Sequence, residues 1–197
     1  MTTPHYWDEA KRDLCASDAV LAKLANRYEG LAMGSRGDAF STLARAIVGQ
    51  QISVKAAQSV WNKFQAEVIE VTPIRVAACE ITRLRACGLS GQKCGYLSDL
   101  AVKFSSGALD PARWTELDDE ALITELTQVK GIGRWTAEMF LIFHMARPDV
   151  LPVDDIGLQR AMGLHYNNGK PLSKLKMRQI SNDWQPWRTV ATWYLWR

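Results

Sequence analysis

Apolar residues recur along the chain three or four positions apart, and no stretch shows the strict apolar–polar alternation of a strand. The segment after Asp38 is representative, because its apolar residues fall on one side of a helix: Phe40, Leu43, Ala44, Ile47 and Val48. Further helices are expected at 4–16, 18–27, 54–64, 90–104, 118–128, 135–145, 155–164 and 173–184, after Pro73, Pro111 and Pro186, and before Gly88. Ser17 is the expected N-cap of the second helix. The pattern predicts an all-α fold of about ten helices.

A tight glycine link joins two of these helices within residues 122–145. The link reads Lys130-Gly131-Ile132-Gly133, and glycine accepts the positive φ angles that a sharp turn requires. The first turn of the second helix then presents N–H groups and a dipole that favour a phosphate. A plain αα-hairpin with glycine at a helix end gives the same pattern, so the motif alone leaves both interpretations open.

Length and composition fit one compact domain over residues 1–197, or two small lobes that share a core. The chain is 47% hydrophobic and 23% charged, yet no apolar run reaches the roughly 20 residues of a membrane span. The N-terminal residues lack the apolar core of a signal peptide. We therefore expect an intracellular protein without membrane contact.

The net charge of +3 is too small to indicate a nucleic-acid partner, but the charges are unevenly distributed. Residues 156–197 hold seven Lys or Arg against one acid, Asp183, which gives +6 there and leaves −3 for residues 1–155. This asymmetry favours a basic face near the C-terminal end. A solvated helix face would produce it equally well.

Longer motifs carry a resemblance to a family. LTQVKGIGRWTAEMFLIF followed by LPVDDIGLQRA resembles the helix-hairpin-helix, Gly/Pro-rich loop and aspartate of the DNA glycosylase superfamily. ARAIVGQQISVKAA at 44–57, LSGQKCGYLSDLA at 89–101 and WQPWRTVATWYLW at 184–196 are similar to DNA-3-methyladenine glycosylase II. The resemblance implies two helical lobes without an N-terminal β-domain. It also implies a monofunctional glycosylase that flips alkylated purines, of the 3-methyladenine and 7-methylguanine type, out of damaged double-stranded DNA and excises them in base excision repair.

By this resemblance Asp155 is the catalytic acid, in the pattern Asp155-x-Gly157-x-x-Arg160. Breaking the base–sugar bond builds positive charge on C1′, and a nearby carboxylate stabilises that charge and orients water. Asp155 also stands where a helix N-cap belongs, and Asp154 could serve either purpose. Where strand-cutting relatives place a lysine nucleophile, this chain has Trp135, which implies hydrolysis without AP-lyase activity.

The resemblance also supplies the substrate-binding and DNA-binding residues. Trp135 and Trp196 match aromatic positions of the base pocket, where a positively charged methylpurine would stack, although a tryptophan-filled core would explain them too. Met139 replaces a tyrosine of some relatives and offers no aromatic face. Gln51, with Ile52 beside it, matches the residue that fills the gap left by a flipped base; an exposed turn is the alternative. The remaining expected DNA contacts are Lys130, Gly131, Ile132, Gly133, Arg134 and Thr136.

Cofactor expectations are few. Relatives hold a monovalent cation, Na⁺ or K⁺, through hairpin carbonyls that correspond to Thr127, Val129 and Ile132. No iron–sulfur cluster is expected, because no cysteine follows Cys94, and no other cofactor is required. We expect a monomer. Two alternatives stay open: a glycosylase for oxidised, deaminated or mismatched bases, and a non-catalytic helix-hairpin-helix DNA-binding module.

Overall fold

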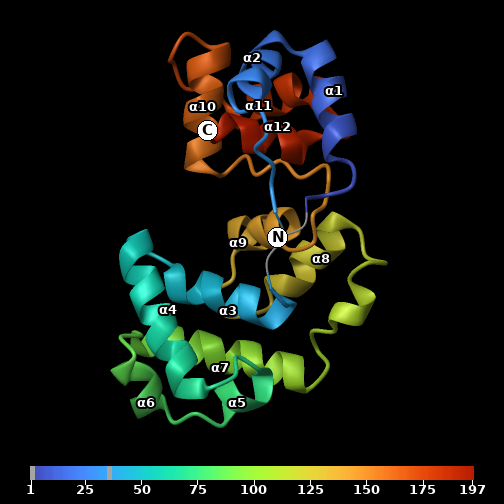
Figure 1. Cartoon of the computed structure of the whole chain (residues 1–197). Helices are drawn as coiled ribbons and strands as arrows, with labels where there is room; N and C mark the ends of the chain where they lie inside the picture. The colour runs from blue at the N-terminus through green and yellow to red at the C-terminus, as the bar shows by residue number, and fades with distance from the viewer. Residues whose placement is uncertain (1–2, 35–36) are drawn as a thin grey trace. The chain divides into compact units, whose positions relative to one another are not determined.

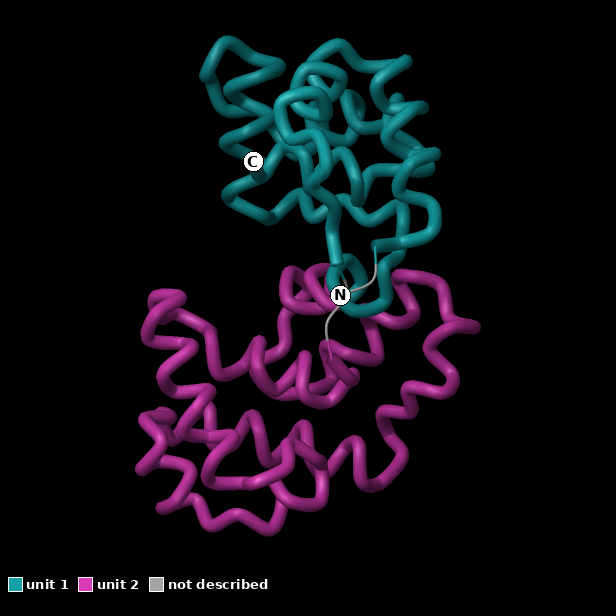
Figure 2. Tube along the Cα trace, viewed as in Figure 1, with its two compact units in different colours: residues 1–36, 141–197 teal, residues 37–140 magenta. Residues whose placement is uncertain are grey.

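A computed structural model describes residues 3–34 and 37–197 of the chain. The described part contains twelve α-helices, two 3-10 helices and no strand, so the all-α prediction is confirmed. The chain divides into two compact units (Figure 2). Unit 1 comprises Met1–Arg36 and Leu141–Arg197, and unit 2 comprises Gly37–Phe140. No helix within the described ranges is both long and apolar enough to span a membrane.

Unit 1 is built around its last helix. Its elements are α1 (Trp7–Ser17), α2 (Ala19–Arg27), α10 (Ile156–Tyr166), α11 (Lys174–Ser181), η2 (Asn182–Trp184) and α12 (Arg188–Leu195). Every residue of α12 from Thr189 to Leu195 is buried, and the helix packs among α1, α2 and α10 (Figure 1). The Trp7 ring meets Trp193 edge to face at 5.0 Å, which joins the first helix to the last.

Asp18, not Ser17, caps α2, which corrects the sequence-based expectation. Its Oδ1 accepts hydrogen bonds from the N–H groups of Val20 and Leu21. Its Oδ2 accepts from the Tyr166 hydroxyl and from the Trp184 indole, at 2.9 and 3.0 Å. A serine hydroxyl could not serve all four donors, and this carboxylate therefore ties α10 and η2 to the start of α2.

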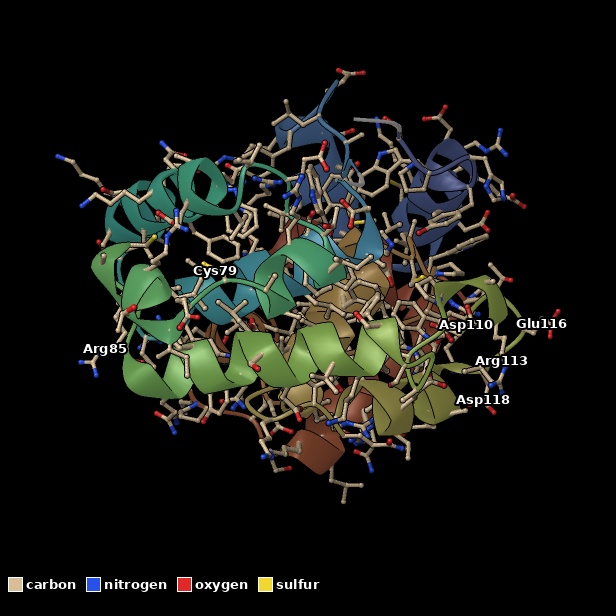
Figure 3. The ribbon with its side chains drawn as sticks, turned by 90° about the horizontal axis from the view of Figure 1, so that it is seen from below. Cys79, Arg85, Asp110, Arg113, Glu116 and Asp118 are labelled. Atoms are coloured by element: carbon tan, nitrogen blue, oxygen red, sulfur yellow. The ribbon has the colours of Figure 1, made fainter. Side chains whose placement is uncertain are left out.

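Unit 2 is organised around α7 (Gly91–Ser105). Its other elements are α3 (Ala39–Gly49), α4 (Val54–Val68), α5 (Pro73–Ala77), α6 (Ile81–Ala86), η1 (Pro111–Arg113), α8 (Asp119–Leu126) and most of α9 (Arg134–Phe143). The predicted apolar stripe of α3 is buried and faces α4 and α7. Figure 3 shows α7 running between Arg85 of α6 at one end and the 110–118 segment at the other.

Two predicted helices are shorter in the structure. The one expected after Pro111 is a single 3-10 turn, because Trp114 directly follows it and is fully buried against Phe104 and Phe140. The one expected over 173–184 ends as α11 at Ser181 and tightens into η2. A 3-10 turn of this kind is common at the end of an α-helix.

Candidate functional site

The predicted site residues form two groups, one in each unit. Asp155 and Trp196 belong to unit 1, whereas the hairpin link, Gln51, Ile52, Trp135 and Met139 belong to unit 2.

In unit 1 the carboxylate of Asp155 is held at the start of α10. Its Oδ1 accepts a hydrogen bond from the Leu158 N–H at 2.6 Å, which is the N-cap geometry, and another from the Trp196 indole N–H at 2.8 Å. The side chain is half-buried. The N-cap interpretation is therefore correct, and it is compatible with catalysis because capping orients the carboxylate without burying it.

Gly157 makes room for this arrangement, a requirement that sequence reasoning did not identify. A Cβ at this position would stand 3.0 Å from Asp155 Oδ1 and 3.3 Å from Trp196 Cδ1. Both distances are tighter than ordinary van der Waals contact. Any larger residue would therefore push the carboxylate and the indole away from their present positions.

Asp154 lies in a different environment from its neighbour. It is exposed and forms an ion pair with Lys174 at the start of α11. Adjacent in sequence, the two carboxylates thus have separate partners: Asp154 faces a surface ammonium group, and Asp155 faces a backbone amide and an indole. The structure therefore gives these two adjacent acids different surroundings.

Trp196 does more than offer an aromatic face. Besides its bond to Asp155, its ring stacks on Phe143 with centroids 5.7 Å apart and planes inclined by 20°. The ring is half-buried, whereas five other tryptophans are core residues no more than 4% exposed: Trp7, Trp61, Trp114, Trp184 and Trp193. Trp196 is therefore fixed on both its edge and its face.

In unit 2 the two glycines of the hairpin link differ in backbone conformation and in the space around them. Gly131 has a φ of +84°, as predicted, and a Cβ there would stand 2.1 Å from Cδ2 of Tyr96. Gly133 has no positive φ, and a Cβ there would meet nothing within 4 Å. The fold therefore requires glycine at 131 but not at 133.

Helix α7 holds the hairpin link from one side. The Lys130 N–H donates to Asp99 Oδ2 at 2.9 Å, and Asp99 is paired with Lys103 at 2.8 Å. Partial desolvation opposes ionisation of Asp99, but hydrogen bonds from Lys103 and the Lys130 N–H outweigh it and lower its pKa below the usual value. With Tyr96 packed on Gly131, these contacts fix the backbone before α9 begins.

The turn at residues 49–52, between α3 and α4, is held from within unit 2 as well. Gln51 and Ile52 are exposed, and Gln51 has a φ of +56°, an uncommon conformation for a residue other than glycine. Gln50 Nε2 donates to the Gly131 carbonyl at 2.7 Å, and Lys93 Nζ donates to the carbonyls of Val48 and Gln50. Sequence reasoning assigned no role to Gln50 or Lys93.

A cavity of about 670 Å³ opens beside this turn. Its lining includes five of the residues predicted to contact substrate or DNA: Gln51, Gly131, Trp135, Thr136 and Met139. Trp135 is 46% exposed, so it is not a core residue. Arg45, Lys93 and Tyr96 add charge and a further ring to the wall.

Arg134, predicted to contact phosphate, is engaged by acids of its own unit. Its guanidinium pairs with Glu120 through two bonds and with Glu138 at 3.0 Å. The hydrogen bond to Glu120 is the largest cause that raises the pKa of Arg134 above its ordinary value, and the charges of both carboxylates add to it. A phosphate would therefore have to compete with two carboxylates. The Lys130 side chain, by contrast, is exposed.

Of the carbonyls predicted to hold a cation, that of Ile132 lies in the link, and those of Thr127 and Val129 precede it. That of Val129 accepts the Ile132 N–H at 3.0 Å, and the Thr127 hydroxyl bonds back to the Ile123 carbonyl. Over residues 3–34 and 37–197, no three His, Cys, Asp or Glu side chains gather to hold a metal ion. The four cysteines are free thiols.

An all-helical fold with a glycine hairpin and a capped, half-buried aspartate defines a class of DNA repair protein. The family model described as "HhH-GPD superfamily base excision DNA repair protein" matches residues 44–186, and the chain belongs to this family. It is 35% identical over 181 residues to DNA-3-methyladenine glycosylase 1 of Schizosaccharomyces pombe, covering 90% of this chain and 79% of that protein.

Two solved structures agree. The 3-methyladenine DNA glycosylase of S. pombe in complex with abasic DNA superposes with a TM-score of 0.82 and 32% identity, over 95% of each chain. The DNA-3-methyladenine glycosidase of Bacillus halodurans gives a TM-score of 0.89 and 31% identity, over 100% of this chain and 91% of that chain.

Proposed function

We propose that this protein is a monofunctional DNA glycosylase that excises alkylated purines from duplex DNA during base excision repair inside the cell. The observation that carries the proposal is the Asp155 carboxylate, half-buried and fixed by Leu158 and Trp196, at the position where the family has its aspartate. The named relatives, 3-methyladenine glycosylases that match most of this chain, support the choice of substrate.

Asp155 stabilises the charge that develops as the base departs. The bond from C1′ to a methylated purine breaks readily because the purine already carries positive charge, so little acid assistance is needed. Positive charge then accumulates on the sugar, and a preoriented carboxylate stabilises it without reorganising. The hydrogen bonds to Oδ1 provide this orientation before substrate arrives.

Water is the proposed nucleophile, so the DNA strand stays intact. An indole, Trp135, occupies the position of the lyase lysine. Lys93 lines the same cavity, but its amine donates to two backbone carbonyls, at 2.8 and 2.7 Å. The product is therefore an abasic site, without a covalent enzyme–DNA intermediate.

The cavity of unit 2 is the proposed receptor for the flipped base. A cationic methylpurine stacked on Trp135 gains roughly 0.5–2 kcal/mol from cation–π attraction. Met139 adapts its shape to the base without adding a second ring. By resemblance, Trp196 of unit 1 is a further substrate-binding residue. Gln51 at the tip of the 49–52 turn, with Ile52 beside it, would fill the gap in the duplex.

The hairpin link is the proposed grip on the DNA backbone. The first turn of α9 directs N–H groups towards a phosphate, and Gly133 lets the strand approach because no atom of the described residues, apart from its two chain neighbours, lies within 4 Å of where its Cβ would stand. The carbonyls of Thr127, Val129 and Ile132 would hold a monovalent cation, whose charge would favour a phosphate beside the link. We propose that one monomer performs the whole reaction.

The test is base release from DNA treated with dimethyl sulfate, measured by chromatography for wild type and Asp155→Asn. We expect the wild type to release 3-methyladenine and 7-methylguanine, with strands breaking only after alkali. Immediate strand breaks, or an adduct trapped by borohydride, would contradict the monofunctional mechanism. Base release only from oxidised or deaminated duplexes, assayed in parallel, would favour the second glycosylase class. Duplex binding without release of any lesion would leave a non-catalytic module.

A further inference from the structure

One face of α7 contacts both of the segments proposed to touch DNA. Lys93 reaches the end of α3, Tyr96 packs on Gly131, and Asp99 accepts the Lys130 N–H. These side chains are three residues apart, so they project from the same side of the helix. The three contacts lie within unit 2, and Lys93 and Tyr96 also line the cavity beside the 49–52 turn.

Lys93 meets a need that the end of α3 creates. The last carbonyls of a helix have no intrahelical partner and carry the negative end of its dipole. The Lys93 ammonium donates to two of them, Val48 at 2.8 Å and Gln50 at 2.7 Å. The next residue, Gln51, has the left-handed φ of +56°. The lysine therefore holds the backbone on the near side of the strained residue.

Gln50 connects this fixed point to the hairpin. Its main chain accepts from Lys93, while its side-chain amide donates to the Gly131 carbonyl at 2.7 Å. A continuous series of contacts thus runs from α7 through the 49–52 turn to the link before α9. Because Tyr96 and Asp99 hold the other side of the link, the turn and the hairpin have a common support.

We propose that Lys93 is a positioning residue which, through Gln50, locks the 49–52 turn to the hairpin. The residue that fills the gap in the duplex and the residues that bind the DNA backbone then keep a fixed relative position. The inference rests on the proposed function for its consequence, although the lock itself belongs to the free protein. Burial lowers the pKa of the Lys93 amine. A lowered pKa also suits a lysine nucleophile, which is the one competing role for this side chain. Arginine separates the two roles, because it can donate to both carbonyls but cannot form a Schiff base.

The first experiment compares Lys93→Met, Lys93→Arg and the control Lys63→Met, an exposed lysine of α4 in the same unit. Single-turnover release of methylpurine is measured together with the fluorescence of 2-aminopurine placed beside the lesion, which reports flipping. Lys93→Met should slow release roughly tenfold to a hundredfold and weaken the fluorescence change, as expected for misplaced machinery. Lys93→Arg should restore both, and Lys63→Met should match wild type.

The second experiment measures amide hydrogen exchange in the free protein, so it does not depend on catalysis. Lys93→Met should accelerate exchange at residues 49–52 and also at 130–133, while the rest of α7 stays protected. Gln50→Met should accelerate the same segments, and the double variant should be no worse than the single ones, because both remove the same connection.

Each outcome supports or overturns the lock. Unchanged exchange and unchanged flipping in Lys93→Met would overturn it while leaving the glycosylase assignment intact. A borohydride adduct that both Lys93 variants abolish would make Lys93 a nucleophile, which also overturns it. A wild type that releases no base would remove the proposed function, yet faster exchange at both segments in Lys93→Met would still establish the lock.

Discussion

The acid-bearing part of unit 1 and the part of unit 2 that we propose to face DNA are built in opposite ways. The Asp155 site uses a single stretch, Asp155 to Leu158, together with the distant Trp196. The unit 2 surface joins three segments some forty residues apart, through Lys93, Gln50 and Asp99. A local site should be damaged mainly by changes to its own residues. A surface assembled from distant segments should also be damaged by changes behind it.

The largest expected effect is the loss of charge at position 155. Asparagine caps a helix about as well as aspartate and keeps an oxygen for Leu158 and Trp196. Asp155→Asn should therefore retain its melting temperature and its affinity for abasic DNA but lose roughly 10²- to 10³-fold in single-turnover base release.

Asp154→Asn is the matched control, because it removes the same charge one residue away, at an exposed ion pair with Lys174. The loss of rate in Asp154→Asn should be at least ten times smaller than the loss in Asp155→Asn, since exposed ion pairs contribute little to stability. Equal losses in the two variants would indicate a general electrostatic effect and would contradict the assignment of Asp155 as the carboxylate that faces the sugar.

The next largest effect concerns stability and tests the distant support of the unit 2 surface. Gly131→Ala would place a methyl group 2.1 Å from the Tyr96 ring at a φ of +84°. Backbone strain and overpacking together should lower the free energy of unfolding by roughly 2–5 kcal/mol, measured by urea denaturation.

A Tyr96→Ala background should recover part of the loss from Gly131→Ala, because it removes the ring but not the unfavourable φ. The recovered part measures the steric clash, and the remainder measures the backbone strain. If the ring deletion recovers nothing, Tyr96 does not hold the link in place.

A smaller effect is expected at Gly157, within the local site. The Cβ of Gly157→Ala would displace Asp155 Oδ1 or the Trp196 ring by a few tenths of an ångström. Base release should slow about tenfold, because small misplacements near the reacting atoms are costly. DNA binding should be unchanged in a gel-shift assay. A rate equal to wild type would show that the carboxylate tolerates movement.

The same contrast explains what the sequence could predict. The all-α class, the apolar stripe of α3 and most helix starts follow from local spacing and caps, as Asp38, Ser53 and Asp118 illustrate. The N-cap role of Asp155 was also predictable, because the N–H group that it caps lies only three residues further along the chain. Local chemistry is visible in local sequence.

Lys93 and Gln50 could not be recognised in this way. A lysine on a helix normally reads as a solvated residue, and nothing near it in sequence reveals that two carbonyls more than forty positions earlier lie within reach. Arg134 shows a mixed case: it stands beside the hairpin glycines, and it pairs with Glu138 one turn further along α9 and with Glu120 of α8. The i,i+4 partner is visible in the sequence, whereas only the tertiary structure brings Glu120 to Arg134.

The smallest expected effect distinguishes the two hairpin glycines. Gly133→Ala has ordinary backbone angles and open space around its Cβ, so its stability should stay within about 1 kcal/mol of wild type and can even rise. If a phosphate approaches the start of α9, however, the methyl group holds the strand away. Losing part of a charge-assisted hydrogen bond should weaken duplex binding about fivefold, or roughly 1 kcal/mol.

Fluorescence anisotropy with duplex DNA at fixed ionic strength measures this loss, and base release at saturating DNA should change little. Gly169→Ala, at a positive φ in the turn after α10, is the matched control with the opposite expected result. Backbone strain there should lower stability, whereas duplex binding should stay unchanged because the substitution is not in the hairpin. An unaltered dissociation constant for Gly133→Ala would mean that DNA does not come close to the link. Neither DNA binding nor folding would then explain why glycine stands at position 133.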